Sequence, residues 1–145
     1  MKTINAIAVM LLLASASVDA APLIFDSEAR LPSSEPPPRF RAISRGPGIK
    51  VESPRHDGET VKSPFDLKLA FKPHGGAKID PGKVKIIYLN NPDVNLADRV
   101  KPYISENGIN FVNAEAPVGK HVIQFVLEDT DGRQSSKVID LNVVK

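Results

Sequence analysis

Cysteine is absent from the 145-residue chain, so the sequence permits neither a disulfide bond nor a thiolate metal site. A lipid anchor attached through an N-terminal cysteine is excluded for the same reason. The fold must therefore be held by its hydrophobic core alone. This is sufficient at such a length, because domains near 100 residues bury roughly 60–70% of the surface that their unfolded chains expose.

An excess of one charge sign is also absent. The 19 lysines and arginines face 17 aspartates and glutamates, which leaves a formal net charge of +2. Proteins that bind nucleic acid through its phosphates usually carry a strong basic excess or a basic stripe. The near balance of charge therefore predicts that nucleic acid is not a partner.

Long apolar runs are missing after the first 20 residues. Lys2 precedes the apolar run Ile7–Leu13, and Val18-Asp19-Ala20 fits the small-x-Ala pattern of signal-peptide cleavage. A membrane-spanning helix needs about 20 apolar residues, so this run is too short to be one. Residues 1–20 are predicted to be a signal peptide that leaves a mature chain starting at Ala21. The protein is predicted to be periplasmic or secreted, with no membrane span.

Proline is abundant at the start of the mature chain. Residues 21–47 contain six prolines, which predict a flexible, extended leader rather than a ladder-forming strand. The apolar patch Pro22–Phe25 stands out in this polar segment. It either adds a strand to the sheet edge of a partner, which makes Phe25 a candidate binding residue, or packs back onto its own domain. The second interpretation is favoured.

Residues 48–145 alternate between apolar and polar side chains, as β-strands with one buried face do. Residues 64–71 show this best, with Phe65, Leu67, Leu69 and Phe71 on one face. Similar segments occur at 49–53, 83–89, 107–112, 121–129 and 136–144. In the last two segments the side chains expected to point inward are Ile123, Phe125, Leu127, Ile139, Leu141 and Val143.

Residues 93–104 fit either a strand or a short helix. We expect a turn at 90–93 and one helical turn, followed by a short edge strand through Tyr103, because Pro102 disfavours helical dihedrals at Lys101. The total is about seven short strands in one domain of residues 48–145. This number predicts an all-β fold, an antiparallel immunoglobulin-like (Ig-like) β-sandwich.

The turns between these strands carry recognisable motifs, namely Pro54 with Asp57-Gly58, Val61–Pro64, Pro117–His121, and Asp129 with Gly132. Together they resemble the bacterial Ig-like domains of exported proteins. The resemblance covers most of residues 48–145 and implies the same sandwich. It also implies an adhesive, spacer or accessory role, which is usual for such domains.

A more distant resemblance links the chain to the periplasmic copper-resistance protein C family, which shares the sandwich, the signal peptide and a Pro-x-Gly turn. Copper ligands in that family include a histidine at the mature N-terminus and an Asp-Gly-His near the end of the chain. This sequence has Ala21 at the first place and Asp131-Gly132-Arg133 at the second. A guanidinium stays protonated and has no lone pair to donate, so the resemblance implies the fold without copper binding.

Glu128, Asp129 and Asp131 crowd the stretch LEDTDGRQSS and are the candidate ligands for a divalent metal. An EF-hand loop needs further oxygen ligands at a spacing that Gly132 and Arg133 interrupt. The favoured interpretation is a hairpin turn, in which both aspartates accept hydrogen bonds from backbone N–H groups and Gly132 takes left-handed dihedrals. Calcium bound with help from a neighbouring turn is the alternative.

The three histidines, His56, His74 and His121, are not spaced as metal ligands usually are, and we expect them at turns or on the surface. His121 follows a Pro-x-Gly turn. It is expected to hydrogen-bond to nearby backbone at a corner of the sandwich, as a corner tyrosine does in other sandwiches. No cofactor is predicted.

Lysines gather on both sides of the loop that follows residue 72. Lys68, Lys83 and Lys85 are the candidates for a basic rim that contacts an anionic polymer or a lipid headgroup, provided that the two flanking strands lie near each other. The alternative is that these lysines solubilise the sheet and protect its edges from strand addition.

The sequence offers no Gly-x-Ser-x-Gly elbow and no HExxH helix, so we predict that the protein is not an enzyme. The predicted function is that of an exported binding or accessory module that engages a protein or a cell-envelope polymer. The alternative is a periplasmic carrier of a small ligand or a divalent metal.

Overall fold

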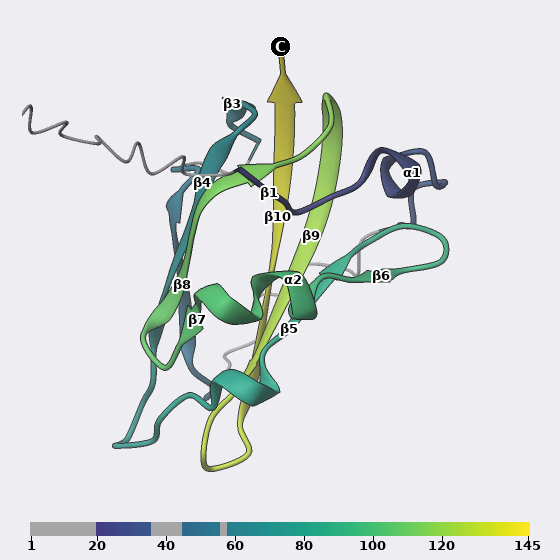
Figure 1. Cartoon of the computed structure of the whole chain (residues 1–145). Helices are drawn as coiled ribbons and strands as arrows, with labels where there is room; N and C mark the ends of the chain where they lie inside the picture. The colour runs from purple at the N-terminus through teal and green to yellow at the C-terminus, as the bar shows by residue number, and fades with distance from the viewer. Residues whose placement is uncertain (1–19, 36–44, 56–57) are drawn as a thin grey trace, which may run out of the picture.

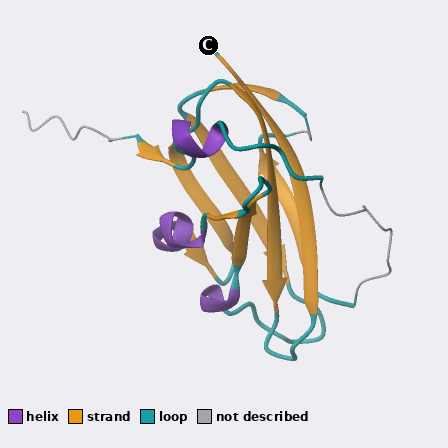
Figure 2. Cartoon of the chain, turned by 90° about the vertical axis from the view of Figure 1, so that its right-hand side faces the viewer, coloured by secondary structure: helices purple, strands orange, loops and turns teal. Residues whose placement is uncertain are grey.

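The computed structural model describes residues 20–35, 45–55 and 58–145, so residues 1–19 of the predicted signal peptide and His56 lie outside the described residues. Two five-stranded sheets pack face to face (Figures 1 and 2). The first sheet contains β1 (Ala21–Pro22), β2 (Gly48–Ser53), β4 (Phe65–Lys72), β7 (Ile104–Ser105) and β8 (Gly108–Glu115). The second contains β3 (Thr60–Lys62), β5 (Lys85–Tyr88), β6 (Val94–Asn95), β9 (Gly119–Glu128) and β10 (Gln134–Val144).

This arrangement confirms the predicted all-β, Ig-like sandwich. Six of the predicted strands are present as β2, β4, β5, β8, β9 and β10, and three further strands, β1, β6 and β7, have two residues each. The pairings are antiparallel apart from β1 with β8 and β3 with β10, which are parallel. The short strand β3 is not among the strands predicted from the sequence, because residues 60–62 are too few to show an alternating pattern of their own.

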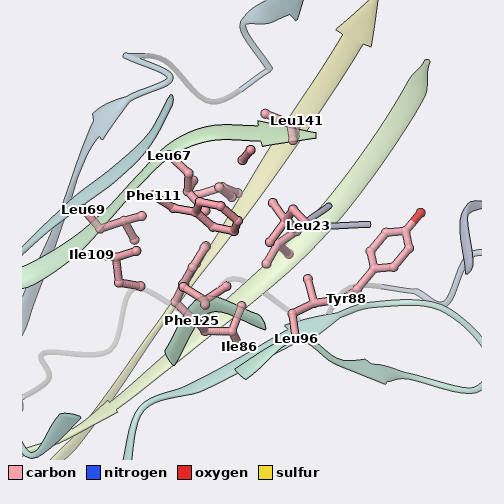
Figure 3. Close-up of a cluster of buried hydrophobic side chains, with 14 of the residues drawn as sticks. Leu23, Leu67, Leu69, Ile86, Tyr88, Leu96, Ile109, Phe111, Phe125 and Leu141 are labelled. Atoms are coloured by element: carbon pink, nitrogen blue, oxygen red, sulfur yellow. The ribbon is translucent and has the colours of Figure 1, made fainter. Parts of the chain in front are cut away.

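The core lies between the sheets and follows the predicted alternation. Phe65, Leu67, Leu69 and Phe71 of β4 are buried, while Asp66 and Lys68 face outward. The inward side chains of β9 and β10 are those expected, namely Ile123, Phe125, Leu127, Ile139, Leu141 and Val143. Figure 3 shows how side chains from both sheets, such as Phe111 and Phe125, meet in this layer.

In residues 93–104 the predicted helical turn is present, but the predicted strand through Tyr103 is not. The helical turn exists as α2 (Ala97–Val100), but the 3-10 helix η2 (Lys101–Tyr103) follows it directly, so Tyr103 is not in a strand. Lys101 keeps helical dihedrals (φ −46°, ψ −43°) despite the proline that follows. Proline is tolerated in the first turn of a helix, where its missing N–H has no partner to lose. The edge strand β7 begins one residue later, at Ile104.

The start of the predicted leader also differs from expectation. Residues 20–35, here called the arm, lie against the sandwich: β1 pairs with β8, Leu23 is fully buried, and α1 (Asp26–Ala29) follows. This corrects the flexible leader predicted for residues 21–47 over its first part and confirms that Pro22–Phe25 packs back onto its own domain. The reason is that Leu23 and Ile24 gain more from burial in the core than the prolines lose in ladder bonds. Residues 36–44 lie outside the described part of the chain.

A second, three-residue 3-10 helix, η1 (Pro81–Lys83), completes the helical segments described. None of the helices in the described ranges is long and apolar enough to cross a membrane.

Candidate functional site

The acidic stretch forms the hairpin between β9 and β10, at the lower end of the molecule in Figure 1. Asp129 is 1% exposed, and its Oδ1 accepts hydrogen bonds from the backbone N–H groups of Asp131 (3.0 Å) and Arg133 (2.9 Å). Gly132 takes left-handed dihedrals (φ +75°), as predicted. The carboxylate of Asp129 is therefore the structural centre of the turn.

Arg133 joins the carboxylates of this hairpin to the neighbouring loop. Its Nε donates to Oδ2 of Asp129 (2.9 Å), and its Nη2 donates to Oδ2 of Asp131 (2.8 Å) and to the carbonyl of His74 (2.9 Å). Asp131 was expected to accept from backbone N–H groups, and that detail is wrong because the guanidinium occupies its carboxylate instead. One arginine thus forms ion pairs with both aspartates.

Glu128 is engaged in the same way by neighbouring side chains. Lys83 Nζ lies 2.8 Å from its Oε1, and Gln134 Nε2 donates to its Oε2 at 2.8 Å. The hydrogen bond from Lys83 holds the pKa of Glu128 below its usual value. Burial alone would raise the pKa of Asp129, but the hydrogen bonds from Arg133 and Asp131 outweigh it and the pKa is lowered.

These contacts decide what the hairpin end can do. The three candidate metal ligands, Glu128, Asp129 and Asp131, all bind cationic side chains of the protein itself. Across the described ranges, no group of three or more His, Cys, Asp or Glu residues is placed to hold a metal ion. The arrangement supports a turn whose charges are satisfied internally.

Of the three candidate lysines, Lys68 lies apart from Lys83 and Lys85, which both lie near Glu128. Lys68 lies on the outer face of β4 in the first sheet, 3.3 Å from Asp66, whereas Lys85 belongs to β5 in the second sheet. The strands that flank the loop are not hydrogen-bonded neighbours, since β4 pairs with β2 and β8, and β5 pairs with β6 and β9. The condition for a shared basic rim is therefore not met.

His121 marks a corner at the opposite end of the sandwich. It is 2% exposed, its Nε2 lies 2.7 Å from the carbonyl of Pro117, and its Nδ1 lies 2.8 Å from the hydroxyl of Tyr88. A carbonyl can only accept, so Nε2 carries the proton and Nδ1 accepts from the tyrosine. Burial lowers the pKa of His121 and keeps the ring neutral. The corner role inferred from the sequence agrees with this geometry.

The arm is fixed at this same end by Arg99 of α2, a residue that the sequence analysis did not single out. Its guanidinium forms a two-pronged ion pair with Glu28 and donates to the carbonyl of Leu23 at 3.0 Å. It also lies over the ring of Phe25, 4.3 Å from the centroid. The hydrogen bond from Arg99 lowers the pKa of Glu28. Asn90 adds a bond from its Nδ2 to the carbonyl of Glu28 at 2.8 Å.

A shallow groove, here called the arm groove, runs between the arm and the turn that joins β8 to β9. Its volume is about 270 Å³, and it is lined by Pro22, Ile24, Phe25, Asp26, Ser63, Glu115, Ala116 and Pro117. Phe25 is 45% exposed, and Val118, next to the groove, is 58% exposed. The apolar lining of the groove is formed by proline, isoleucine, alanine and phenylalanine side chains, and the exposed Asp26 and Glu115 lie at its rim.

Comparison with known proteins adds fold likeness only. No protein-family model matches the chain, and no curated protein does. The protein CopC from Methylosinus trichosporium OB3b is 19% identical, with 66% of this chain and 93% of that chain covered and a TM-score of 0.44. The fibronectin(III)-like modules of Clostridium thermocellum CbhA are 16% identical, with 67% and 46% covered and a TM-score of 0.39. The fold assignment rests on the two sheets themselves, and function must be argued from the site.

Proposed function

We propose that the protein is an exported, non-enzymatic Ig-like module that binds a segment of another protein in the arm groove. The observation that carries this proposal is Phe25, an aromatic side chain that is 45% exposed and that has one face packed against the guanidinium of Arg99. Aromatic residues that are fixed before binding are typical centres of binding energy, because little side-chain freedom is lost when the partner arrives.

The surroundings of Phe25 fit an extended peptide. Pro22 and Pro117 form rigid apolar walls, and Ser63 Oγ accepts from the N–H of Ala116 at 3.2 Å, which holds the β8–β9 connection in place. Loops held by a rigid scaffold are common binding surfaces. The acidic rim formed by Asp26 and Glu115 favours a partner segment with basic residues.

The titratable groups elsewhere support binding rather than catalysis. His121 is buried and engaged on both ring nitrogens, and Asp129 is committed to the hairpin turn. A catalytic acid or base must reach a proton on a substrate, which these buried groups do not do. Export remains part of the proposal and rests on the signal-peptide pattern.

Site-specific cross-linking in the intact cell tests the proposal. A photo-reactive residue at Val118 is expected to capture one discrete partner, and the same residue at Val112 is the control, because Val112 is 41% exposed but does not line the groove. Adding Phe25→Ser to the Val118 chain should abolish capture while the protein stays folded. Equal capture at both positions, or capture that survives Phe25→Ser, would reject the groove as the binding site. Recovery of a glycan in place of a protein would assign the module to an envelope polymer.

A further inference from the structure

A second cavity, here called the slot, opens on the side of the sandwich between β2 of the first sheet and β10 of the second. Its volume is about 270 Å³, and it is lined by Ile49, Lys50, Val51, Pro54, Arg55, Lys137, Ile139 and Asp140. The floor is apolar, since Ile49 and Val51 are half-buried and Pro54 and Ile139 are buried. The slot therefore reaches the edge of the hydrophobic core.

Lys137 shows that the sandwich is open at this point. Side chains two residues apart on a strand share a face, so Lys137 lies on the same face of β10 as Ile139, Leu141 and Val143. Those three are buried in the core, whereas Lys137 is exposed. The strand β3 pairs only with Asn142–Val144, at the far end of β10, and does not cover the lysine.

Cations surround the apolar floor. Lys50, Arg55 and Lys137 line the slot together with one acid, Asp140. Within the described ranges no ion pair joins any of the three cations to an acid, in contrast to Lys83, Arg99 and Arg133 at the two ends of the sandwich. An apolar slot with positive charge at its mouth is complementary to a ligand with an apolar body and an anionic head.

The shape of β2 argues against an added peptide strand. The ladder between β2 and β4 shifts register between Val51 and Ser53, and Pro54 follows at once. Bulges and prolines on an edge strand prevent regular pairing with another chain. A small amphiphile needs no ladder and fits the slot without it.

We infer that the slot binds a single-chain fatty carboxylate. The acyl chain lies against Ile49, Val51 and Ile139, and the carboxylate meets Lys137 and Arg55 at the mouth. This inference goes beyond the proposed function and does not depend on it, because the slot and the arm groove share no residue.

Titration of the full-length mature protein with dodecanoate, below the concentration at which it forms micelles, tests the inference by two-dimensional amide NMR. The backbone amides of Val51, Lys137 and Ile139 are expected to shift in a saturable way. Dodecanol tests the need for the charge and acetate tests the need for the chain, and both should bind far more weakly. Lys137→Glu and Arg55→Glu are each expected to weaken dodecanoate binding at least about threefold, as loss of one exposed charge contact does. Both residues are exposed, so the variants should fold normally.

Lys85→Glu is the matched control, because Lys85 is also exposed on the second sheet but does not line the slot. It should leave dodecanoate binding unchanged. The inference fails if the slot amides do not shift, if dodecanol binds as tightly as dodecanoate, or if Lys85→Glu weakens binding as much as Lys137→Glu. It also fails if an extended acidic peptide, rather than dodecanoate, shifts the amides along β2.

Discussion

The two ends of the sandwich are each organised around one arginine, but the two arginines reach their partners over very different distances in the sequence. Arg133 binds Asp129, four residues away in the same hairpin. Arg99 binds Glu28, which is 71 residues away and belongs to the arm. Arg133 stabilises a turn whose residues are already close in the sequence. Arg99 attaches a separate segment to the sandwich and, in doing so, leaves one face of an aromatic ring available at the surface.

The two ends differ in whether their ion pairs only stabilise the fold or also place an exposed side chain beside a groove. At the hairpin end all three carboxylates of Glu128, Asp129 and Asp131 are occupied by cationic side chains. At the arm end the same kind of ion pair fixes Phe25 beside a groove with exposed acids at its rim. A dense cluster of acidic residues in a sequence is therefore a weaker sign of a site than an ion pair that orients an exposed aromatic side chain.

The strongest way to break the comparison is to detach the arm. Leu23→Ala removes a fully buried side chain and should lower the free energy of unfolding by about 2–5 kcal/mol, as deletion of a buried leucine usually does. Chemical denaturation measures this loss. Ala29→Gly, in the half-buried part of the same arm, is the control for a change in the arm outside the core and should cost clearly less. Equal losses would mean that the arm does not contribute to the core through Leu23.

The next largest effect is expected at the hairpin end. Asp129→Ala leaves the backbone N–H groups of Asp131 and Arg133, and the Nε of the Arg133 side chain, without their acceptor, so it should destabilise the protein strongly. Asp131→Ala removes only the exposed partner and should have a small effect. Thermal melting of the two variants gives the ranking. A larger loss for Asp131→Ala would contradict the central place given to Asp129.

The pH dependence of stability should distinguish the arm end. Burial lowers the pKa of His121 in the folded protein from an ordinary value of 6.5, so the unfolded chain binds the proton more readily. The stability that this histidine contributes is therefore complete above pH 6.5 and is lost as the pH falls below that value. Unfolding free energies measured at several pH values should show this slope, and His121→Gln should remove it. A slope that is unchanged in His121→Gln would have to come from another group.

The smallest change in the free energy of unfolding is expected at Phe25. Phe25→Ser removes a partly exposed ring and its contact with Arg99, and should cost only about 0.5–1 kcal/mol. Equilibrium unfolding of this variant checks the value. A cost as large as that of Leu23→Ala would show that Phe25 is part of the core rather than a binding residue, and would weaken the proposed function.

The sequence revealed most of the fold because the signals were local. Alternation in 64–71 and 121–129 identified both the strands and their inward faces, and the Asp–Gly pattern identified the hairpin. The contacts of Arg99 could not be predicted, because they join residues that are 71 and 76 positions apart in the sequence and depend on how the arm packs against α2. The prolines in residues 21–47 suggested flexibility, but two buried side chains, Leu23 and Ile24, decided the conformation of the arm. The local sequence pattern does not show how much free energy the burial of these two side chains contributes.

The pairing of the arm with β8 also sets an order of events for a chain that emerges from its N-terminus. The N–H groups of Leu23 and Ile24 both donate to the carbonyl of Glu115, which is separated from Leu23 by most of the protein. Contacts between segments so distant form only after the intervening chain is available. The arm must therefore wait for β8 before it can dock. A chain cut short before β8 would leave the arm without the strand that it pairs with and Leu23 without the carbonyl that its N–H binds.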